Sequence, residues 1–356
     1  MIGVDLFSGA GGMSLGASLA GVNVALAVES DRWASRTFSD NHQKTTVLQG
    51  DIRQVTSKDL RDFAKRRDEL VVFGGPPCQG FSWSNLKTRR LNNEANWLFL
   101  EFVRVINQLR PAWFVFENVQ GIVNTEGGQF ISELKSLLNP KYKLTESLLN
   151  AKEFGVPQDR TRYFLVGSRE GVPYSIPTPS FSSTPTVDDA IRDLPSLING
   201  DSICWRPYGR KRPSQYGLLL RGDRSGCYNH LVTRNSPYVL KRYEHVPQGG
   251  NWEDIPPRLM KNYADRTRCH TGIYHRLQSA LPSVVIGNFR KNMLIHPSEN
   301  RGLSIREAAR IQSFPDSYRF QGSIGFQQQQ VGNAVPPHLA RAVFTAILQA
   351  SQSEEA

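Results

Sequence analysis

The sequence predicts an α/β protein: a doubly wound domain with a mostly parallel sheet, joined to a second, smaller and irregular domain. Three observations lead to this fold class. Short apolar runs alternate with helix-like periodic segments up to about residue 172, composition changes near Gly171, and periodicity returns at residue 304. Such alternation is typical of a parallel sheet with helices on both faces. The 356 residues are enough for one large and one smaller domain around a real hydrophobic core.

Each predicted element rests on its own local pattern. Strands are expected where short apolar runs are bounded by turn residues, and helices where apolar positions recur at helical spacing. The expected strands are Ile2–Leu6, Val22–Val28, Leu70–Phe73, Trp113–Phe116 and Tyr163–Val166, and the expected helices are Trp97–Leu109, Gly128–Leu138, Ser304–Ser313 and His338–Gln349.

A linker separates the two predicted domains. Four prolines among serines lie between Gly171 and Thr186, and these residue types favour turns and irregular structure. From about residue 174 to 296 the chain is rich in Pro, Gly, Arg and Tyr and lacks regular periodicity. We expect a first domain of residues 1–173 plus 325–356, and a second domain, with the hinge, of residues 174–324.

Positive charge is concentrated in the second domain. The net charge is +11, and residues 205–276 alone hold 14 Lys or Arg against five Asp or Glu, a net +9. Nine Trp or Tyr residues are interleaved in this segment, which we call the basic insert. Basic groups neutralise phosphates and aromatic rings stack or wedge, so the insert is a candidate nucleic-acid surface. The alternative interpretation is a solvated basic face.

Composition argues against several classes of protein. No apolar run reaches the roughly 18 residues that a membrane span needs, and the N-terminus lacks a signal-peptide pattern. The four cysteines, at 78, 204, 227 and 269, have no disulfide spacing. Cys227 with His230, or Cys269 with His270, lacks the second ligand pair of a structural zinc site. We expect a reduced, cytoplasmic protein without a metal.

A glycine turn, FSGAGGMSLG at 7–16, follows the first expected strand. Glycines there let a ligand approach the backbone, although the pattern is neither a dinucleotide fingerprint nor a phosphate loop. Glu29 ends the second strand, where a carboxylate can accept both ribose hydroxyls, and Asp51 follows the next strand, where it can meet an adenine amino group. Each acid alone is more often a surface or capping residue. Their regular placement predicts a site for an adenosine with a zwitterionic tail.

The segment VVFGGPPCQGFSWS at 71–84 is the most informative in the chain. Its glycines and prolines lift Cys78 off the end of a strand on a rigid loop. A free cysteine is more often a small buried hydrophobe, but these neighbours do not describe a core position. As a thiolate it would be a good nucleophile. The polar stretch 85–96 is expected to be a mobile loop that closes over DNA phosphates.

These segments resemble the DNA cytosine-5 methyltransferases. PPCQGFS is similar to the catalytic loop of that family, and the other family motifs follow in the family's order over all but about 174–275. They are DLFSGAGG at 5–12, GDI at 50–52, ENV at 117–119, QDRTR at 158–162, Arg276 with LPSVVI at 281–286, REAARIQSFPDSY at 306–318 and VGNAVPP at 331–337. The resemblance implies a Rossmann-like methyltransferase domain and a variable target-recognition domain.

The resemblance implies a role for four residues. The Cys78 thiolate would add to cytosine carbon 6 and make carbon 5 able to attack the methyl group of S-adenosylmethionine. Glu117 would hydrogen-bond or protonate ring nitrogen 3, because a carboxyl in a closed pocket can have a raised pKa; a cap or ion-pair role is the alternative. Arg162 would contact the base carbonyl oxygen, and Arg160 would support the active site and a nearby phosphate. The target base must first be flipped out of the duplex.

The resemblance also implies ligands and partners. S-Adenosylmethionine is expected to contact Phe7, Ser8, Gly9, Gly11, Gly12, Glu29, Asp51, Ile52, Pro77, Leu98, Asn333 and Ala334, and DNA is expected to contact Gln79, Ser82, Ser84, Lys87, Arg89 and Arg90. We expect a monomer that acts on double-stranded DNA in the cytoplasm, at the nucleoid. Enzymes of this length usually belong to bacterial restriction–modification systems with a cognate restriction endonuclease encoded nearby; an orphan or phage enzyme would have the same chemistry.

Two rival functions make different demands on the sequence. A transfer RNA cytosine-5 methyltransferase usually carries a Cys-Phe-Thr variation near the ENV motif, and this chain has no such tripeptide. A non-catalytic DNA-binding regulator on the same fold would be favoured by loss of Cys78, Glu117 or the glycine turn, and all are present. The basic insert also suits duplex recognition. We therefore predict a DNA methyltransferase.

Overall fold

The computed structural model describes residues 1–77, 98–169, 171–179, 183–261, 271–289 and 293–352. The chain divides into two compact units. Unit 1 comprises Met1–Ala151, Thr161–Ser180 and Pro337–Ala356, and unit 2 comprises Lys152–Arg160 and Phe181–Pro336.

Three segments group differently from the expected domain ranges. Residues 174–180 belong to unit 1, whereas the sequence pattern assigned them to the second domain. Residues 152–160 and 325–336 belong to unit 2, whereas the sequence pattern assigned them to the first domain. The reason is local: Gln158 forms a β-bridge with Ser283, and α10 (Ile324–Asn333) packs against α9 (Ile305–Ile311). The assignment of catalysis to one domain and target recognition to the other stays a prediction.

Unit 1 is built on a seven-stranded sheet with the order β3-β2-β1-β4-β5-β7-β6. The strands are β1 (Ile2–Leu6), β2 (Asn23–Glu29), β3 (Thr46–Gln49), β4 (Leu70–Gly74), β5 (Trp113–Val119), β6 (Lys143–Asn150) and β7 (Thr161–Ser168). The first five strands pair in parallel, whereas β7 is antiparallel to both of its neighbours. The carboxyl ends of the five parallel strands therefore share one edge of the sheet.

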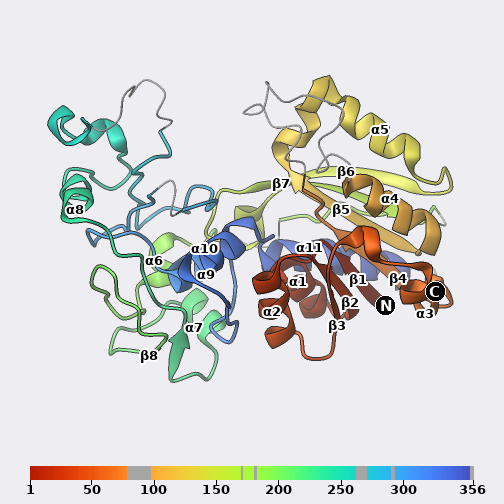
Figure 1. Ribbon diagram of the computed structural model, residues 1–356, viewed down its shortest axis with the longest axis horizontal. Coiled ribbons are helices and arrows are strands. Elements are labelled where there is room, and N and C mark those ends of the chain that lie inside the picture. The colour runs from red at the N-terminus through yellow and green to blue at the C-terminus, as the bar shows by residue number, and fades with distance from the viewer. Residues whose placement is uncertain (78–97, 170, 180–182, 262–270, 290–292, 353–356) are drawn as a thin grey trace. The chain divides into compact units, whose positions relative to one another are not determined.

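Helices cover both faces of this sheet (Figure 1). They are α1 (Gly12–Ala20), α2 (Arg32–Asn41), α3 (Ser57–Ala64), α4 (Leu98–Leu109), α5 (Gln129–Leu137) and α11 (Pro337–Gln352). On one face Val4 and Leu6 share a core with Phe102 of α4. On the other face Phe73 packs against Phe344 of α11, with ring centroids 4.8 Å apart. The doubly wound α/β fold is confirmed, with an antiparallel edge that the apolar runs did not predict.

The C-terminal helix α11 lies against α1, and one glycine of the predicted turn makes this possible. A Cβ at Gly16 would be 2.4 Å from Ala340 Cβ and 2.5 Å from the Pro337 carbonyl oxygen. No other residue could let two helices approach so closely. Gly16 therefore serves helix packing, whereas the glycines before it shape the turn itself.

Unit 2 is irregular, with short elements. They are α6 (Val187–Ile191), β8 (Trp205–Pro207), α7 (Gln215–Arg221), β9 (Gly226–Tyr228), α8 (Pro237–Tyr243), α9 and α10. Strands β8 and β9 form a small antiparallel sheet. The sequence predicted this irregularity, and α9 confirms the helix expected at 304–313.

A buried ionic network stabilises unit 2. Arg310 donates hydrogen bonds of 2.6 Å to Asp193 and to Asp316, and the Tyr208 hydroxyl donates to Asp316 as well. Burial disfavours the Arg310 charge, but hydrogen bonds to these carboxylates and their attraction raise the pKa of Arg310 above its usual value. A buried guanidinium is tolerated only when it is paired in this way. The REAARIQSFPDSY motif is thus core structure that binds Tyr208 of the basic insert.

The aromatic residues of the basic insert are only partly at the surface. Tyr216, Tyr243 and Tyr274 are buried, and the Tyr216 hydroxyl donates to the Arg310 carbonyl oxygen. Trp205 is 42% exposed. The interpretation of the interleaved rings as groups that stack on bases is therefore wrong for the three buried tyrosines, which pack the core of unit 2.

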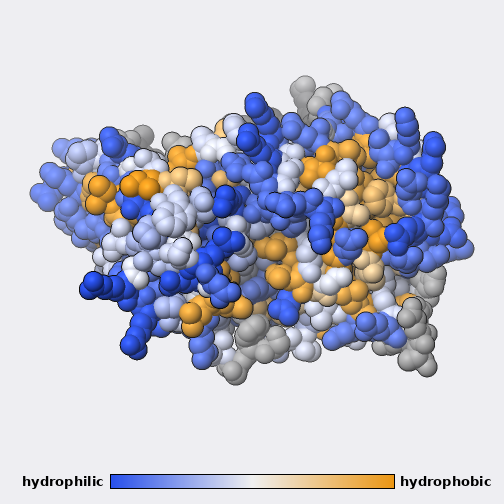
Figure 2. All heavy atoms as spheres, turned by 90° about the horizontal axis from the view of Figure 1, so that it is seen from below, coloured by the Kyte–Doolittle hydropathy of each residue, from blue (hydrophilic) through white to orange (hydrophobic). Residues whose placement is uncertain are grey.

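The described part of the chain contains no helix that is long and apolar enough to cross a membrane. In the view of Figure 2, apolar side chains reach the surface in several separate groups among hydrophilic ones. Scattered exposure of this kind is ordinary for a folded protein and carries no functional meaning by itself.

Candidate active site

The glycine turn joins β1 to α1 at the edge of the sheet where the parallel strands end. Phe7 has a φ of 64°, and Gly9 and Gly11 have φ values of 55° and 87°. Glycine adopts this left-handed region freely, whereas an aromatic residue rarely does. A Cβ on Gly9 would meet no atom within 4 Å, and Gly12 begins α1. The turn therefore presents open main chain at the sheet edge.

Two carboxyl groups hold the turn in shape. Glu29, at the end of β2, accepts the backbone N–H of Gly9 and that of Asp31, both at 2.7 Å. Burial raises the pKa of Glu29, and these hydrogen bonds oppose the shift. Asp5 in β1 is buried and accepts a hydrogen bond of 2.5 Å from Ser14 Oγ in α1, and burial raises its pKa well above the usual value. The Asp5–Ser14 contact ties the two ends of the turn together.

His42 supports the same turn from the end of α2. Its ring is buried, stacks on Phe38 with ring centroids 4.3 Å apart, and hydrogen-bonds the backbone of Gly11. Burial lowers the pKa of His42 to about 4. The imidazole is therefore neutral at physiological pH, and the turn carries no charge from this side.

His42 should make the free energy of unfolding fall as the pH drops from about 6.5 towards 4. The unfolded histidine takes up a proton near pH 6.5 and the folded one only near 4, so protons favour the unfolded state in this window. Between about pH 7 and pH 5, His42→Phe, which keeps the ring stack, should lose about 1–2 kcal/mol less stability than the wild type. Urea unfolding at both pH values measures the difference, and equal losses would contradict the burial of a neutral His42.

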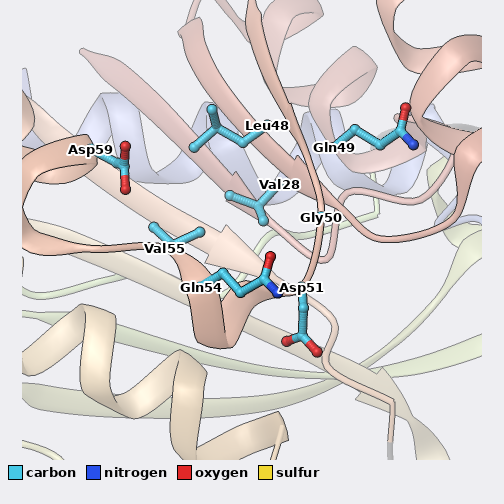
Figure 3. A pocket seen from close by; sticks show the side chains of 8 residues that line it. All are labelled: Val28, Leu48, Gln49, Gly50, Asp51, Gln54, Val55 and Asp59. Atoms are coloured by element: carbon cyan, nitrogen blue, oxygen red, sulfur yellow. The ribbon is translucent and has the colours of Figure 1, made fainter.

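A pocket lies at the ends of β2 and β3 (Figure 3). It is lined by Val28, Leu48, Gln49, Gly50, Asp51, Gln54, Val55 and Asp59. Val28, Leu48 and Val55 supply apolar walls, and the side chain of Asp51 lies at the rim beside Arg53. Hydrogen bonds from Arg53, at 2.5 Å for its Nη2, lower the pKa of Asp51. Apolar walls with a few polar groups suit a flat heteroaromatic ring.

These residues fit S-adenosylmethionine. Ser8 Oγ is buried and has no hydrogen-bond partner in the described part of the chain. The Gly9 backbone faces open space, and the Glu29 carboxylate lies at the adjacent strand end. A polar turn, a carboxylate and an apolar pocket match an adenosine with a charged tail.

Glu117 and Arg162 form an ion pair between β5 and β7. Arg162 Nε lies 3.1 Å from Glu117 Oε1, and each side chain is only 10% exposed. Burial lowers the pKa of Arg162, and the Glu117 carboxylate opposes that shift. A Cβ at Gly75 would be 2.6 Å from Glu117 Oε2. Gly75, the second glycine of GGPPC, therefore allows the Glu117 carboxylate to lie against the loop that leads to Cys78.

Asn118 anchors the same loop from the ENV motif. Its Nδ2 donates a hydrogen bond of 2.9 Å to the Pro76 carbonyl oxygen, two residues before Cys78. At the base of the loop, a Cβ on Gly74 would be 1.9 Å from the Leu6 carbonyl oxygen. The end of β4 can therefore pair with β1 only because residue 74 has no side chain. The described residues Gly75 and Pro76 thus converge with Glu117, Asn118 and Arg162 at one edge of the sheet. Cys78 itself lies outside the described residues.

Arg160 has different surroundings from Arg162. It belongs to unit 2, is 1% exposed, and donates to the carbonyl oxygens of Ile286 at 2.9 Å, Gly332 at 2.9 Å and Ala334 at 3.1 Å. The alternation of the two arginines predicts that they point the same way. Arg160 precedes β7, which begins at Thr161, whereas Arg162 lies within the strand, and the shared direction stays a prediction.

Comparison with known proteins identifies the family. The model of the C-5 cytosine-specific DNA methylases matches residues 1–349. The chain belongs to this family. It is 37% identical to the Type II methyltransferase M1.HphI of Haemophilus parahaemolyticus, over 99% of this chain and 87% of that protein. It is 34% identical to the Type II methyltransferase M.DdeI of Desulfomicrobium norvegicum, over 96% of this chain and 86% of that one.

Solved structures agree with the family. A prophage-encoded Escherichia coli protein described as a DNA modification methyltransferase is 28% identical, with a TM-score of 0.80 over 98% of this chain and 99% of that one. DNMT2 from Spodoptera frugiperda is 16% identical, with a TM-score of 0.62, over 99% of each chain, which shows a shared fold. The predicted enzyme class, DNA cytosine-5 methyltransferase, is confirmed. Membership in the methyltransferases also implies S-adenosylmethionine as the methyl donor.

The remaining predicted residues of this methyltransferase are dispersed over the two units. Ile52 is buried in the core of unit 1, Leu98 packs against that core, and Pro77 is exposed. Asn333 is exposed at the end of α10 in unit 2, next to Ala334. Outside the described residues lie the predicted DNA contacts Gln79, Ser82, Ser84, Lys87, Arg89 and Arg90. The ligand contacts of all these residues stay predictions.

Sequence reasoning missed several residues that shape the site. Gly75 and Asn118 lie inside recognised motifs, so asking what each motif position contacts could have found them. Ser14 lies inside the recognised glycine segment and His42 in no motif, but the partner of each comes from another element and could not be predicted. His230, which the sequence analysis weighed with Cys227 as a zinc ligand, has protein partners for both ring nitrogens. They lie 2.9 Å from Ser304 Oγ and 2.7 Å from the Pro195 carbonyl oxygen.

Proposed function

We propose that this methyltransferase flips a cytosine out of double-stranded DNA and methylates carbon 5 with Cys78 as the nucleophile. The observation that supports this best is the convergence of the Glu117–Arg162 pair with the loop that leads to Cys78. Asn118 holds that loop two residues before the cysteine. A nucleophile, an acid and a cation would then surround one base, as the chemistry requires.

Each group has a distinct task in the proposed reaction. The Cys78 thiolate adds to carbon 6, and the electron pair of the ring double bond moves towards nitrogen 3. Glu117 hydrogen-bonds or protonates nitrogen 3, which stabilises that charge and leaves carbon 5 nucleophilic. Arg162 contacts the base carbonyl oxygen from its position against Glu117. Carbon 5 would then form a bond to the methyl group as the bond from that methyl to the donor sulfur breaks. When the carbon 5 proton has left to water, the thiolate is expelled, any proton on nitrogen 3 returns to Glu117, and the ring is aromatic again.

S-Adenosylmethionine, when bound, supplies the electrophilic methyl group. We propose that the glycine turn from Phe7 to Gly12 binds its charged tail, that Glu29 accepts its ribose hydroxyls, and that the pocket beside Asp51 takes the adenine. The support is the open backbone at Gly9, the Ser8 hydroxyl without a described partner, and the apolar walls of the pocket. The residues expected from the other motifs, such as Asn333, complete the proposed set.

Glu29→Gln should weaken the binding of S-adenosylmethionine by about 10- to 100-fold. The amide replaces one of the two acceptor oxygens by an NH₂ donor, which would face the backbone N–H donor of Gly9 or Asp31. The variant would also lose a charged hydrogen bond to the ribose. Isothermal titration with S-adenosylmethionine measures this. Glu69→Gln, which removes an exposed carboxylate paired with Arg66, is the matched control and should keep the wild-type Kd. An unchanged Kd in Glu29→Gln would rule out the ribose contact.

We propose a bacterial restriction–modification setting. The two relatives at 34–37% identity over nearly the full chain are both Type II methyltransferases. In this setting the chain acts as a monomer on one short DNA sequence in the cytoplasm and protects it from a cognate endonuclease. The basic insert, with a net charge of +9, would supply the phosphate contacts and target recognition.

Transfer of a labelled methyl group tests the choice of substrate. The protein is incubated with S-adenosylmethionine labelled on its methyl group and with either plasmid DNA or bulk transfer RNA. Label in the plasmid, and none in the RNA, is the expected result. Label in the transfer RNA alone would overturn the DNA proposal and leave the cytosine chemistry intact.

A further inference from the structure

Gln158, the first residue of the QDRTR motif, joins three distant segments of unit 2. Its side chain is fully buried. Nε2 donates to Gln312 Oε1 at 3.0 Å, and Oε1 accepts the Ile286 N–H at 2.9 Å. Gln312 in turn donates to the Val331 carbonyl oxygen at 2.7 Å. One pair of amides thus connects the QDRTR motif with Ile286 and the end of α10.

Arg160 joins the same segments a second time. Its guanidinium donates to the carbonyl oxygen of Ile286 and to those of Gly332 and Ala334. Ile286 therefore gives its N–H to Gln158 and its carbonyl to Arg160. We call these three side chains, Gln158, Arg160 and Gln312, the polar node.

The backbone around the polar node is closely packed. A Cβ at Gly332 would be 2.1 Å from the Gly287 carbonyl oxygen, so the two glycines touch through their main chains. The Asp159 N–H donates to the Ser283 carbonyl at 2.8 Å, and the Ser283 N–H donates to the Pro157 carbonyl at 2.9 Å. Beyond this single β-bridge at Ser283, the loop 283–287 lies outside the named helices and strands, so the side-chain hydrogen bonds of the polar node help to fix its geometry.

The backbone that the polar node contacts carries exposed side chains, which do not contribute to the buried core. Val284 and Val285 are 40% and 47% exposed although Ser283 and Ile286 on either side are buried. Asn333, between the two carbonyls that Arg160 binds, is also exposed. Exposed side chains on a rigidly held, irregular backbone are the arrangement expected of residues that meet a ligand.

We infer that Gln158 and Arg160 are positioning residues for methyl transfer, which act by fixing the loop 283–287 and the C-terminal end of α10 at Asn333. This inference rests on the proposed function, in which Asn333 contacts S-adenosylmethionine. It assigns a new role to Gln158 and moves Arg160 from a phosphate-binding role to a structural contact with backbone carbonyls. The chain continues from Arg160 into β7, so the node also fixes the residue from which the strand carrying Arg162 begins.

The test compares Gln158→Met with Gln328→Met. Both replace a buried glutamine of unit 2 by an apolar side chain of similar size, but Gln328 contacts Thr233 and lies outside the polar node. At saturating S-adenosylmethionine and DNA, and at a temperature where circular dichroism shows both folded, Gln158→Met should have a kcat about 10- to 100-fold below wild type. Gln328→Met should keep the wild-type kcat even if its melting temperature falls equally. Equal kcat values in the two variants would overturn the inference.

Should Gln158→Met fail to fold, Arg160→Lys takes its place. Lysine keeps the charge but has no planar fork that can reach three carbonyl oxygens, so a loss of kcat of similar size is expected. A wild-type kcat in Arg160→Lys would equally overturn the inference. Wild-type protein and Cys78→Ala are measured in the same series. Label transfer by the wild type but not by Cys78→Ala supports the proposed function whatever the Gln158 result, so the two failures are distinguishable.

Discussion

Cys78→Ala is expected to stop methyl transfer to DNA while the Kd for S-adenosylmethionine stays at the wild-type value. Without a thiolate at carbon 6, carbon 5 of the cytosine ring keeps its aromatic, weakly nucleophilic character. Removal of a covalent nucleophile costs roughly 10³-fold or more in rate. Transfer of a labelled methyl group gives the rate, and isothermal titration gives the Kd.

Cys204→Ala is the matched control for this prediction. Cys204 is a free, exposed thiol in unit 2, so its removal should leave the rate unchanged. If Cys78→Ala kept its activity, the nucleophile would have to be another group, and the GGPPC loop would be a structural turn. Loss of activity together with loss of S-adenosylmethionine binding would instead indicate that the substitution had damaged the fold.

Glu117→Gln is expected to lower the rate of methyl transfer by about 10²- to 10³-fold. The amide has nearly the same volume and still fits against Gly75, but it cannot supply a proton to nitrogen 3. It also leaves the Arg162 guanidinium, whose side chain is 10% exposed, without its counter-ion. The expected loss is therefore in kcat, measured in a single turnover with saturating DNA.

Stability has to be separated from chemistry in this variant, because breaking a buried ion pair is itself destabilising. Glu146→Gln serves this purpose: it removes a carboxylate of the same sheet that contacts Lys135 and Tyr163, away from the proposed site. A rate for Glu117→Gln close to that of Glu146→Gln would show that Glu117 only holds Arg162 in place.

The sequence predicted the parallel part of the fold because those strands are buried on both faces. β1 and β4 are apolar at nearly every position, which gives a continuous run with clear ends. β6 could not be found in this way: Lys143 and Glu146 face solvent, and only Leu149 is buried. An edge strand with this exposure has neither an apolar run nor a strict alternation.

The proposed site was predictable wherever one motif carries its own chemistry. Glu29 and Glu117 each follow an apolar strand, and the structure has both at the carboxyl edge of the sheet. The partners of Arg160 could not be predicted, because Ile286 and Gly332 are more than 120 positions away and are bound through backbone carbonyls. A distant partner also explains why the buried tyrosines of the basic insert were interpreted as surface rings. The sequence does not reveal that the Tyr216 hydroxyl donates to the Arg310 carbonyl oxygen.

The most direct test of the proposed function is bisulfite sequencing of plasmid DNA from a methylation-free bacterial host that expresses this chain, beside one that expresses Cys78→Ala. The prediction is that cytosines at one recurring short sequence are protected from conversion in plasmid from the wild-type host. In plasmid from the Cys78→Ala host, the same cytosines should all be converted. Such a result would establish the activity, the nucleophile and the recognition sequence together. Full conversion of every cytosine, by a folded protein that still binds S-adenosylmethionine, would contradict methylation of DNA by this chain acting alone.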